Sequence, residues 1–159
     1  MNSIRYLSSI ITMTFLLLSY AILILIPLPV SADEIRFIRS DRVERLELPF
    51  SDVVRVGNML YLSGMLGVDP NQHVLVEGGV AAQTRQALDN IKALLEANGS
   101  DMNHVVKCTV FLTSSDDWAA MSEVYKTFFN EHLPARSAVT VKGLARNALV
   151  EIECIAILK

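Results

Sequence analysis

Two strand-like stretches near the C-terminus carry the residue types that suggest chemistry. Residues 134–141 and 150–155 are dense in β-branched side chains and alternate in residue type, which predicts two strands. Glu151 and Glu153 fall on one face of the second stretch, and Arg136 falls on the face of the first stretch that its valines leave free. If the two strands pair, the guanidinium and the carboxylates share one surface.

This charged surface has two interpretations. Charged residues on strands usually mark a solvated face of a sheet. Alternatively, Arg136 holds a carboxylate, because its planar guanidinium grips a carboxylate with two hydrogen bonds and stays protonated. Glu151 beside it would then handle a proton during a reaction.

A longer pattern surrounds these two residues. The sequence reads PARS at 134–137, GL at 143–144 and VEI at 150–152, and it is preceded by GNMLYLSG at 57–64, QTRQALDNI at 83–91 and VKCTVFL at 106–112. In order and spacing, these blocks resemble the Rid family, the reactive intermediate deaminases that are also called YjgF-like proteins. The resemblance covers roughly residues 45–158 and speaks more strongly for the fold than for the activity, because function depends on the site.

The resemblance implies a chorismate-mutase-like fold that assembles as a homotrimer, with ligand sites in the clefts between subunits. It implies hydrolysis of a 2-imino acid, such as 2-iminopropionate, to a 2-oxo acid and ammonia, without a metal or organic cofactor. In that reaction Arg136 would hold the substrate carboxylate, main-chain groups near Gly64 and Ala138 would orient a water, and Glu151 would relay protons. The small-molecule partner is therefore a 2-imino or 2-oxo acid. On pattern alone, Gly64 marks a strand end or a bulge.

Three positions depart from the pattern of active family members. Phe50 stands where a tyrosine is often found, Ser122 where an asparagine often lines the cleft, and Ala138 where a cysteine is frequent. These changes leave Arg136 and Glu151 in place, but they bear on the size of the substrate and on its turnover. The alternative function is a binding module, in which the same cleft retains a small carboxylate without turnover.

The first 32 residues form a segment of their own. Residues 6–32 carry no charge, Arg5 precedes them, and a small-residue Val-Ser-Ala site ends the run at 30–32. This layout predicts a signal peptide over residues 1–32, with a membrane anchor as the alternative because the run is long enough to cross a bilayer. Either way, the Rid-like domain over residues 33–159 is expected outside the cytoplasm, periplasmic or secreted, and membrane-attached only if the leader stays uncleaved.

Charge argues against a nucleic-acid partner. The chain carries a net charge of −3, and the leader's one charged residue is Arg5, so the remainder carries −4. Phosphate contacts supply most of the affinity for nucleic acids, and no basic stripe is present in this sequence. A nuclease or translation-inhibitor function, proposed for some relatives, is therefore disfavoured.

Periodicity predicts the elements that position these residues. The expected order is a short edge strand within 33–48, a hairpin over 53–63 that turns at Gly57-Asn58, a helix over 80–98, a strand over 105–112, a helix from about 114 to 132 and a closing strand pair from Pro134. Two amphipathic helices on a sheet of five or six strands make an α+β two-layer sandwich.

The histidines and cysteines predict no metal site. The three histidines are scattered, and none has the spacing of a zinc ligand set. Cys108 and Cys154 both fall in strand patterns among apolar residues. An exported protein could join them in a disulfide, but free cysteine is common in protein cores. We therefore expect two buried free thiols.

Overall fold

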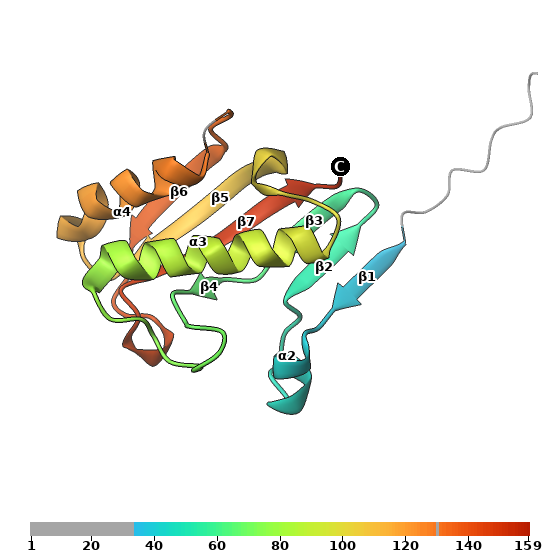
Figure 1. The fold of residues 1–159 in the computed structure, drawn as a ribbon, viewed down its shortest axis with the longest axis horizontal. Helices are drawn as coiled ribbons and strands as arrows, with labels where there is room; N and C mark the ends of the chain where they lie inside the picture. Colours follow the sequence, from blue (N-terminus) through green and yellow to red (C-terminus); the bar gives the residue numbers. More distant parts are fainter. Residues whose placement is uncertain (1–33, 130) are drawn as a thin grey trace, which may run out of the picture. The chain divides into compact units, whose positions relative to one another are not determined.

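The longer helices lie on one face of a single mixed sheet, as Figure 1 shows for α3 and α4. The computed structural model describes residues 34–129 and 131–159, and the predicted leader at residues 1–32 lies outside them. The described strands are β1 (Ile35–Ile38), β2 (Val53–Val56), β3 (Met59–Leu62), β4 (Met65–Leu66), β5 (Val105–Leu112), β6 (Ala135–Thr140) and β7 (Val150–Ile157). The described helices are α2 (Asp41–Arg45), α3 (Gly79–Ala97) and α4 (Trp118–Tyr125). The α+β two-layer sandwich is confirmed, although the two-residue β4 brings the sheet to seven strands.

Local signals set most of these elements. The β2–β3 hairpin turns at Gly57, whose φ of 57° is the left-handed conformation that favours glycine. Along α3, Leu88, Ile91 and Leu95 recur at helical spacing and are fully buried. None of the described helices has the length and apolar character needed to cross a bilayer.

The second predicted helix is shorter than expected. The Ser114 hydroxyl accepts a hydrogen bond from the Asp116 amide at 3.2 Å, which caps the turn that precedes α4. A 3₁₀ turn over Ser115–Asp117 precedes α4, and another over Lys126–Phe128 follows it. The regular helix therefore ends at Tyr125 and does not reach residue 132.

The two charged strands do not pair with each other, contrary to the sequence prediction. The sheet order is β1-β2-β3-β7-β5-β6, with β4 also pairing with β7, so β5 lies between β6 and β7. β5 runs parallel to β6 and antiparallel to β7. β5 and β7 are both eight residues long, and buried residues alternate along β7 and along β5 from Cys108 to Leu112.

This order places Arg136 and Glu151 on opposite faces of the sheet. Arg136 lies opposite Cys108 of β5, whose side chain is fully buried beneath the helices. Glu151 lies opposite Phe111, three residues further along β5 and therefore on the other face. Within one chain, the guanidinium and the carboxylate do not share a surface.

Cys108 and Cys154 form a disulfide, so the prediction of free thiols is wrong. The two residues are direct cross-strand partners on β5 and β7, with their Cα atoms 4.1 Å apart. Directly opposed residues of antiparallel strands project to the same face, which brings the two sulfur atoms together. The predicted burial is confirmed, because the two residues are 0% and 2% exposed.

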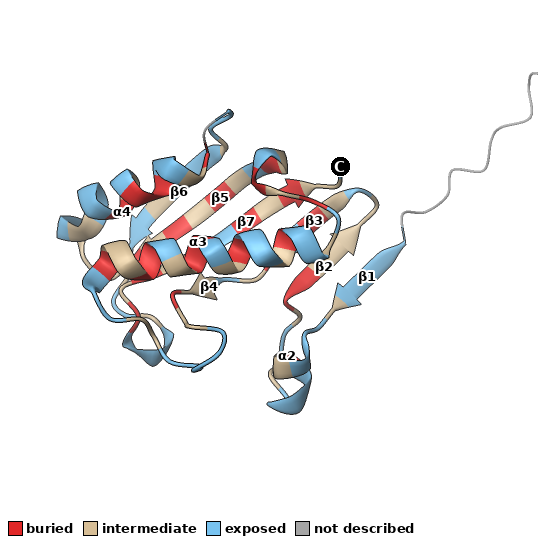
Figure 2. Cartoon of the chain, viewed as in Figure 1, coloured by how far each residue is buried: buried red, intermediate tan, exposed pale blue. Residues whose placement is uncertain are grey.

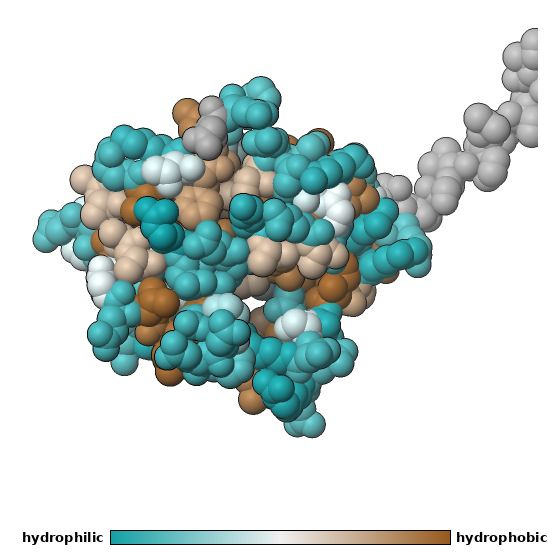
Figure 3. All heavy atoms as spheres, viewed as in Figure 1, coloured by the Kyte–Doolittle hydropathy of each residue, from teal (hydrophilic) through white to brown (hydrophobic). Residues whose placement is uncertain are grey.

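The two faces of the sheet differ in polarity. The hydrophobic core fills the space between the helices and the sheet, where buried residues follow α3, α4 and the central strands in Figure 2. Seen from the helix side, the surface is mostly hydrophilic (Figure 3). The face away from the helices carries exposed Phe37, Tyr61 and Val139 around a polar centre, where Lys107 donates a hydrogen bond to the Ser137 hydroxyl at 2.7 Å.

Candidate active site

Glu151 lies beside a bulge in the strand that flanks it. β3 and β4 both pair with β7, with Tyr61 opposite Ile155 and Met65 opposite Ile152. Residues 62–64 therefore oppose residues 153–154, so the β3–β4 side carries one extra residue. Such bulges bend a strand and redirect side chains, and they are frequent next to active sites.

Gly64 sits in this bulge, as the sequence predicts, and its backbone lies against the Glu151 carboxylate. A Cβ atom added to Gly64 would overlap Oε1 of Glu151 and would also meet its Cγ at 3.0 Å. The missing side chain therefore makes room for the carboxylate. The same gap lets a ligand approach the main chain beside it.

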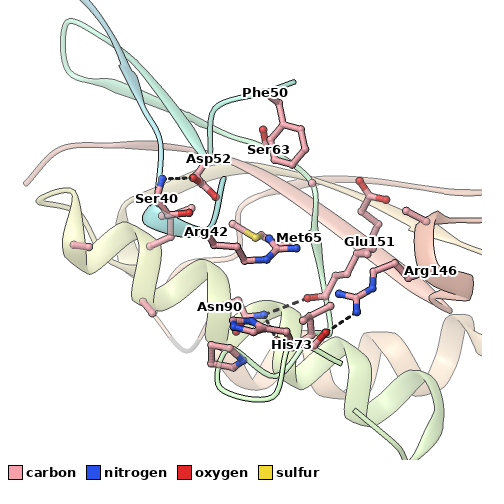
Figure 4. Close-up of a pocket in the computed structure, with 18 residues that line it drawn as sticks. Ser40, Arg42, Phe50, Asp52, Ser63, Met65, His73, Asn90, Arg146 and Glu151 are labelled. Carbon is pink, nitrogen blue, oxygen red and sulfur yellow. Dashed lines mark hydrogen bonds between the residues drawn. The ribbon is translucent and has the colours of Figure 1, made fainter. Parts of the chain in front are cut away.

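A cleft of about 530 Å³ opens next to these two residues. Figure 4 shows Phe50, Ser63 and Glu151 along one side of the cleft, and Asn90 and His73 along the other. Asn90 of α3 donates hydrogen bonds to the carbonyls of Leu66 and Val68, which holds the segment after the bulge on the helix. The cleft is thus walled by a helix and by the irregular edge of the sheet.

Partial burial raises the pKa of Glu151, and the neighbouring Glu153 carboxylate adds to this effect. No described residue donates a hydrogen bond to its carboxylate. A carboxyl group with a raised pKa exchanges protons more readily near neutral pH, which suits a general acid–base.

Replacing Glu151 with glutamine is expected to stabilise the fold while lowering activity. Because the pKa of Glu151 is raised in the folded protein, the folded protein binds more protons than the unfolded chain at pH values between the unfolded and the folded pKa. The wild type therefore loses stability as the pH rises through this range. The variant should therefore melt above the wild type at about pH 8, and the difference should vanish below the usual pKa of glutamate. Thermal melts across pH measure this, with Glu96→Gln on the exposed face of α3 as the control. A wild type that melts higher than Glu151→Gln at every pH would contradict the prediction.

Arg136 belongs to a second group of side chains on the helix-covered face. Its Nη1 donates to the Ser122 hydroxyl at 3.3 Å and lies 4.0 Å from the Met121 sulfur. The guanidinium carbon lies 4.9 Å from the centre of the Tyr125 ring. Burial raises the pKa of Tyr125 to about 12, so the ring stays neutral under the cation. Among the described residues, no carboxylate pairs with Arg136, and its remaining donors are available to an anion.

The predicted site residues therefore fall into two groups. Phe50, Gly64 and Glu151 line the cleft together. Ser122 and Arg136 are in contact beside α4, and Ala138 lies two residues further along β6, on the same face as Arg136. A single chain does not bring the two groups together.

The polar cleft residues missed from the sequence include Arg42, His73, Asn90 and Arg146. They come from α2, a loop, α3 and the turn before β7, and no spacing in the sequence links them. No group of three or more metal-ligating side chains lies together in the described part of the chain.

Replacing Gly64 with alanine is expected to displace the Glu151 carboxylate and to lower activity by roughly a hundredfold, since small misplacements of a catalytic group have effects of this size. Gly143→Ala is the matched control, because a Cβ at Gly143 meets no atom within 4 Å. Steady-state kinetics and thermal melts of both variants distinguish loss of geometry from loss of fold. Equal activity in the two variants would show that the contact between the Gly64 backbone and the Glu151 carboxylate has no catalytic consequence.

Comparisons with known proteins agree with this architecture. The sequence profile of the family described as Endoribonuclease L-PSP matches residues 43–158. The 2-iminobutanoate/2-iminopropanoate deaminase of Mus musculus is 46% identical over 109 residues, which cover 69% of this chain and 81% of that protein.

Solved structures show the same fold. The YjgF gene product of E. coli is 38% identical with a TM-score of 0.71, and the match covers 78% of this chain and 99% of that one. E. coli TdcF with bound serine is also 38% identical, with a TM-score of 0.66 over 70% of this chain and 89% of that one. The matched profile spans the bulge at Gly64, Glu151 and the Arg136 group, so the chain belongs to the endoribonuclease L-PSP family, which is also known as the Rid family.

Proposed function

We propose that the protein hydrolyses 2-imino acids, such as 2-iminopropionate and 2-iminobutanoate, to 2-oxo acids and ammonia. The observation that carries this proposal is the Glu151 carboxyl group, which has a raised pKa and lies in a cleft against the bare backbone of Gly64. The 46% identity to a mouse protein named for this activity supports it.

The reaction needs a placed water and one group that moves protons. The water oxygen attacks C2 of the imine as Glu151 accepts a proton from the water. The electron pair of the C=N bond moves to nitrogen, which takes up a proton, and a carbinolamine forms. Its hydroxyl then loses a proton, the C=O bond forms, the C–N bond breaks, and the nitrogen leaves as ammonia after protonation by Glu151. Each proton released by oxygen is taken up by nitrogen, so the reaction proceeds without a metal or organic cofactor.

The working form in this proposal is a homotrimer with the site between subunits. Arg136 would come from one chain and Glu151 from the next, which accounts for their positions on opposite faces of one sheet. The exposed Phe37, Tyr61 and Val139 on the face away from the helices supply apolar area for such an assembly. Closed rings of this kind place identical contacts at every subunit boundary.

We further propose that the protein is exported and that residues 1–32 act as its signal peptide, with a membrane anchor as the alternative. The Cys108–Cys154 disulfide supports a location outside the reducing cytoplasm. Mass measurement of the purified native protein tests the processing and the assembly together.

The test of the activity is a trapping assay. An amino-acid oxidase generates 2-iminopropionate, semicarbazide traps it, and the added wild-type protein is expected to lower the amount trapped. Glu151→Gln should lower the rate by about 10²- to 10⁴-fold, the usual contribution of a general acid–base. An unchanged trapped amount, with 2-oxo acids still bound, would favour a binding module, a function consistent with the serine bound by E. coli TdcF.

A further inference from the structure

Two arginines with no assigned role reach into the cleft beside Glu151. Arg42 comes from α2, and Arg146 comes from the turn that precedes β7. Figure 4 shows their guanidinium groups entering the cleft from opposite sides, between Glu151 and His73. The cleft therefore contains positive charge that the proposed hydrolysis does not use.

This charge has no partner within the described residues. None of the ion pairs there involves Arg42 or Arg146. Arg146 donates to the carbonyl oxygen of His73 at 2.5 Å through Nη2 only, which leaves its other donors unused. Among the described residues, neither guanidinium group forms a hydrogen bond or an ion pair with the Glu151 carboxylate.

The other carboxylate of the cleft is already engaged. Asp52 is only 7% exposed and accepts a hydrogen bond from the Ser40 amide at 2.6 Å. That bond holds the start of α2, and the fully buried Val43 anchors the same helix. Arg42 therefore projects from an anchored element, and no described carboxylate forms an ion pair with it.

The position of Arg146 is also fixed by its surroundings. Arg146 has a φ of 62°, a left-handed conformation that is uncommon for arginine and persists where neighbouring contacts hold it. The hydrogen bond to His73 ties this turn to the loop across the cleft. The guanidinium group is thus held at the cleft rather than free in solvent.

We propose that the cleft selects 2-imino acids that carry a second carboxylate, the imines of acidic amino acids. This inference rests on the proposed function, in which Arg136 of a second copy holds the first carboxylate. A guanidinium fork matches a carboxylate in geometry and charge, and two forks facing one cleft form an acid-binding site.

The experiment compares two imines in the trapping assay, generated by oxidases from aspartate and from alanine. The wild type is expected to show a higher kcat/KM for the dicarboxylic imine. Arg42→Gln and Arg146→Gln should each lower the dicarboxylic-to-monocarboxylic ratio by roughly tenfold or more, the value of a charge-assisted hydrogen bond. Arg85→Gln, an exposed arginine of α3 that does not line the cleft, is the matched control.

A second arm separates this inference from the proposed function. Calorimetry measures binding of 2-oxoglutarate and of 2-oxobutyrate to the same four proteins, which requires no turnover. The inference is supported if the wild type and Arg85→Gln prefer the dicarboxylic acid and if Arg42→Gln and Arg146→Gln lose that preference. This result supports it even if no imine is hydrolysed. Equal binding of the two acids by the wild type, or a preference that survives both substitutions, overturns it.

Discussion

Replacing Arg136 with glutamine is expected to lower kcat/KM for 2-iminopropionate at least about a hundredfold, because the substrate carboxylate loses two charge-assisted hydrogen bonds of about 1.5 to 3 kcal/mol each. The fold should be little affected, since Arg136 is exposed and has no carboxylate partner among the described residues. Initial rates in the trapping assay measure the effect, and thermal melts check the fold. Arg85→Gln should behave as the wild type.

Mixing two inactive variants tests where the partner of Arg136 lies. A trimer that contains Arg136→Gln chains and Glu151→Gln chains regains one intact site at the boundary where a normal Arg136 meets a normal Glu151. Chains mixed equally and at random should recover about a quarter of the wild-type rate. If the two residues act within one chain, mixing restores nothing, and the site between subunits is ruled out. If Arg136→Gln alone keeps the wild-type rate, the carboxylate is held elsewhere.

Removing the disulfide is expected to have the largest effect on stability. Cys108 and Cys154 are 46 residues apart, and cross-linking a loop of that length lowers the entropy of the unfolded chain by an amount worth about 4 kcal/mol at 25 °C. The double variant Cys108→Ala/Cys154→Ala should therefore unfold at a lower denaturant concentration and melt about 10 °C or more below the wild type. Denaturant titration and calorimetry measure both changes.

The reduced wild type is the matched control, because it keeps the volume of both sulfur atoms in the core. The reduced wild type should have nearly the same stability as the double variant. This comparison separates the effect of losing the cross-link from the effect of the small cavity that alanine leaves. Thiol titration of the unfolded, unreduced protein should find no free thiol. Two titratable thiols per chain would contradict the cross-link itself.

Most of the elements were predictable from the sequence because their signals are local. The hairpin needs only a glycine turn between two apolar runs, and α3 needs only Leu88, Ile91 and Leu95 at helical spacing. The strand order was not predictable in this way. The position of β5 between β6 and β7 depends on the packing of the whole sheet, and no local signal in residues 134–155 predicts it.

The arrangement of the site and the state of the cysteines also lack a local signal in the sequence. Buried thiols and a buried disulfide have the same apolar neighbours in the sequence, and only the cross-strand register of Cys108 with Cys154 distinguishes them. The contact between Gly64 and Glu151 depends on a one-residue bulge far from Glu151 in the chain. Arg42 and Arg146 were missed because a short helix and a left-handed turn position them, and neither has a periodic pattern.

The insertion of β5 between β6 and β7 separates the two groups of predicted site residues. Under the proposed function, the grip on the acid group would depend on β6 and α4, whereas discrimination of the remaining substrate would depend on the cleft around Arg42 and Arg146. An engineer who varies only the lining of the cleft would leave the acid clamp intact and could redirect the catalyst toward other side chains. Evolution has the same freedom, because a function depends on the site that a fold carries.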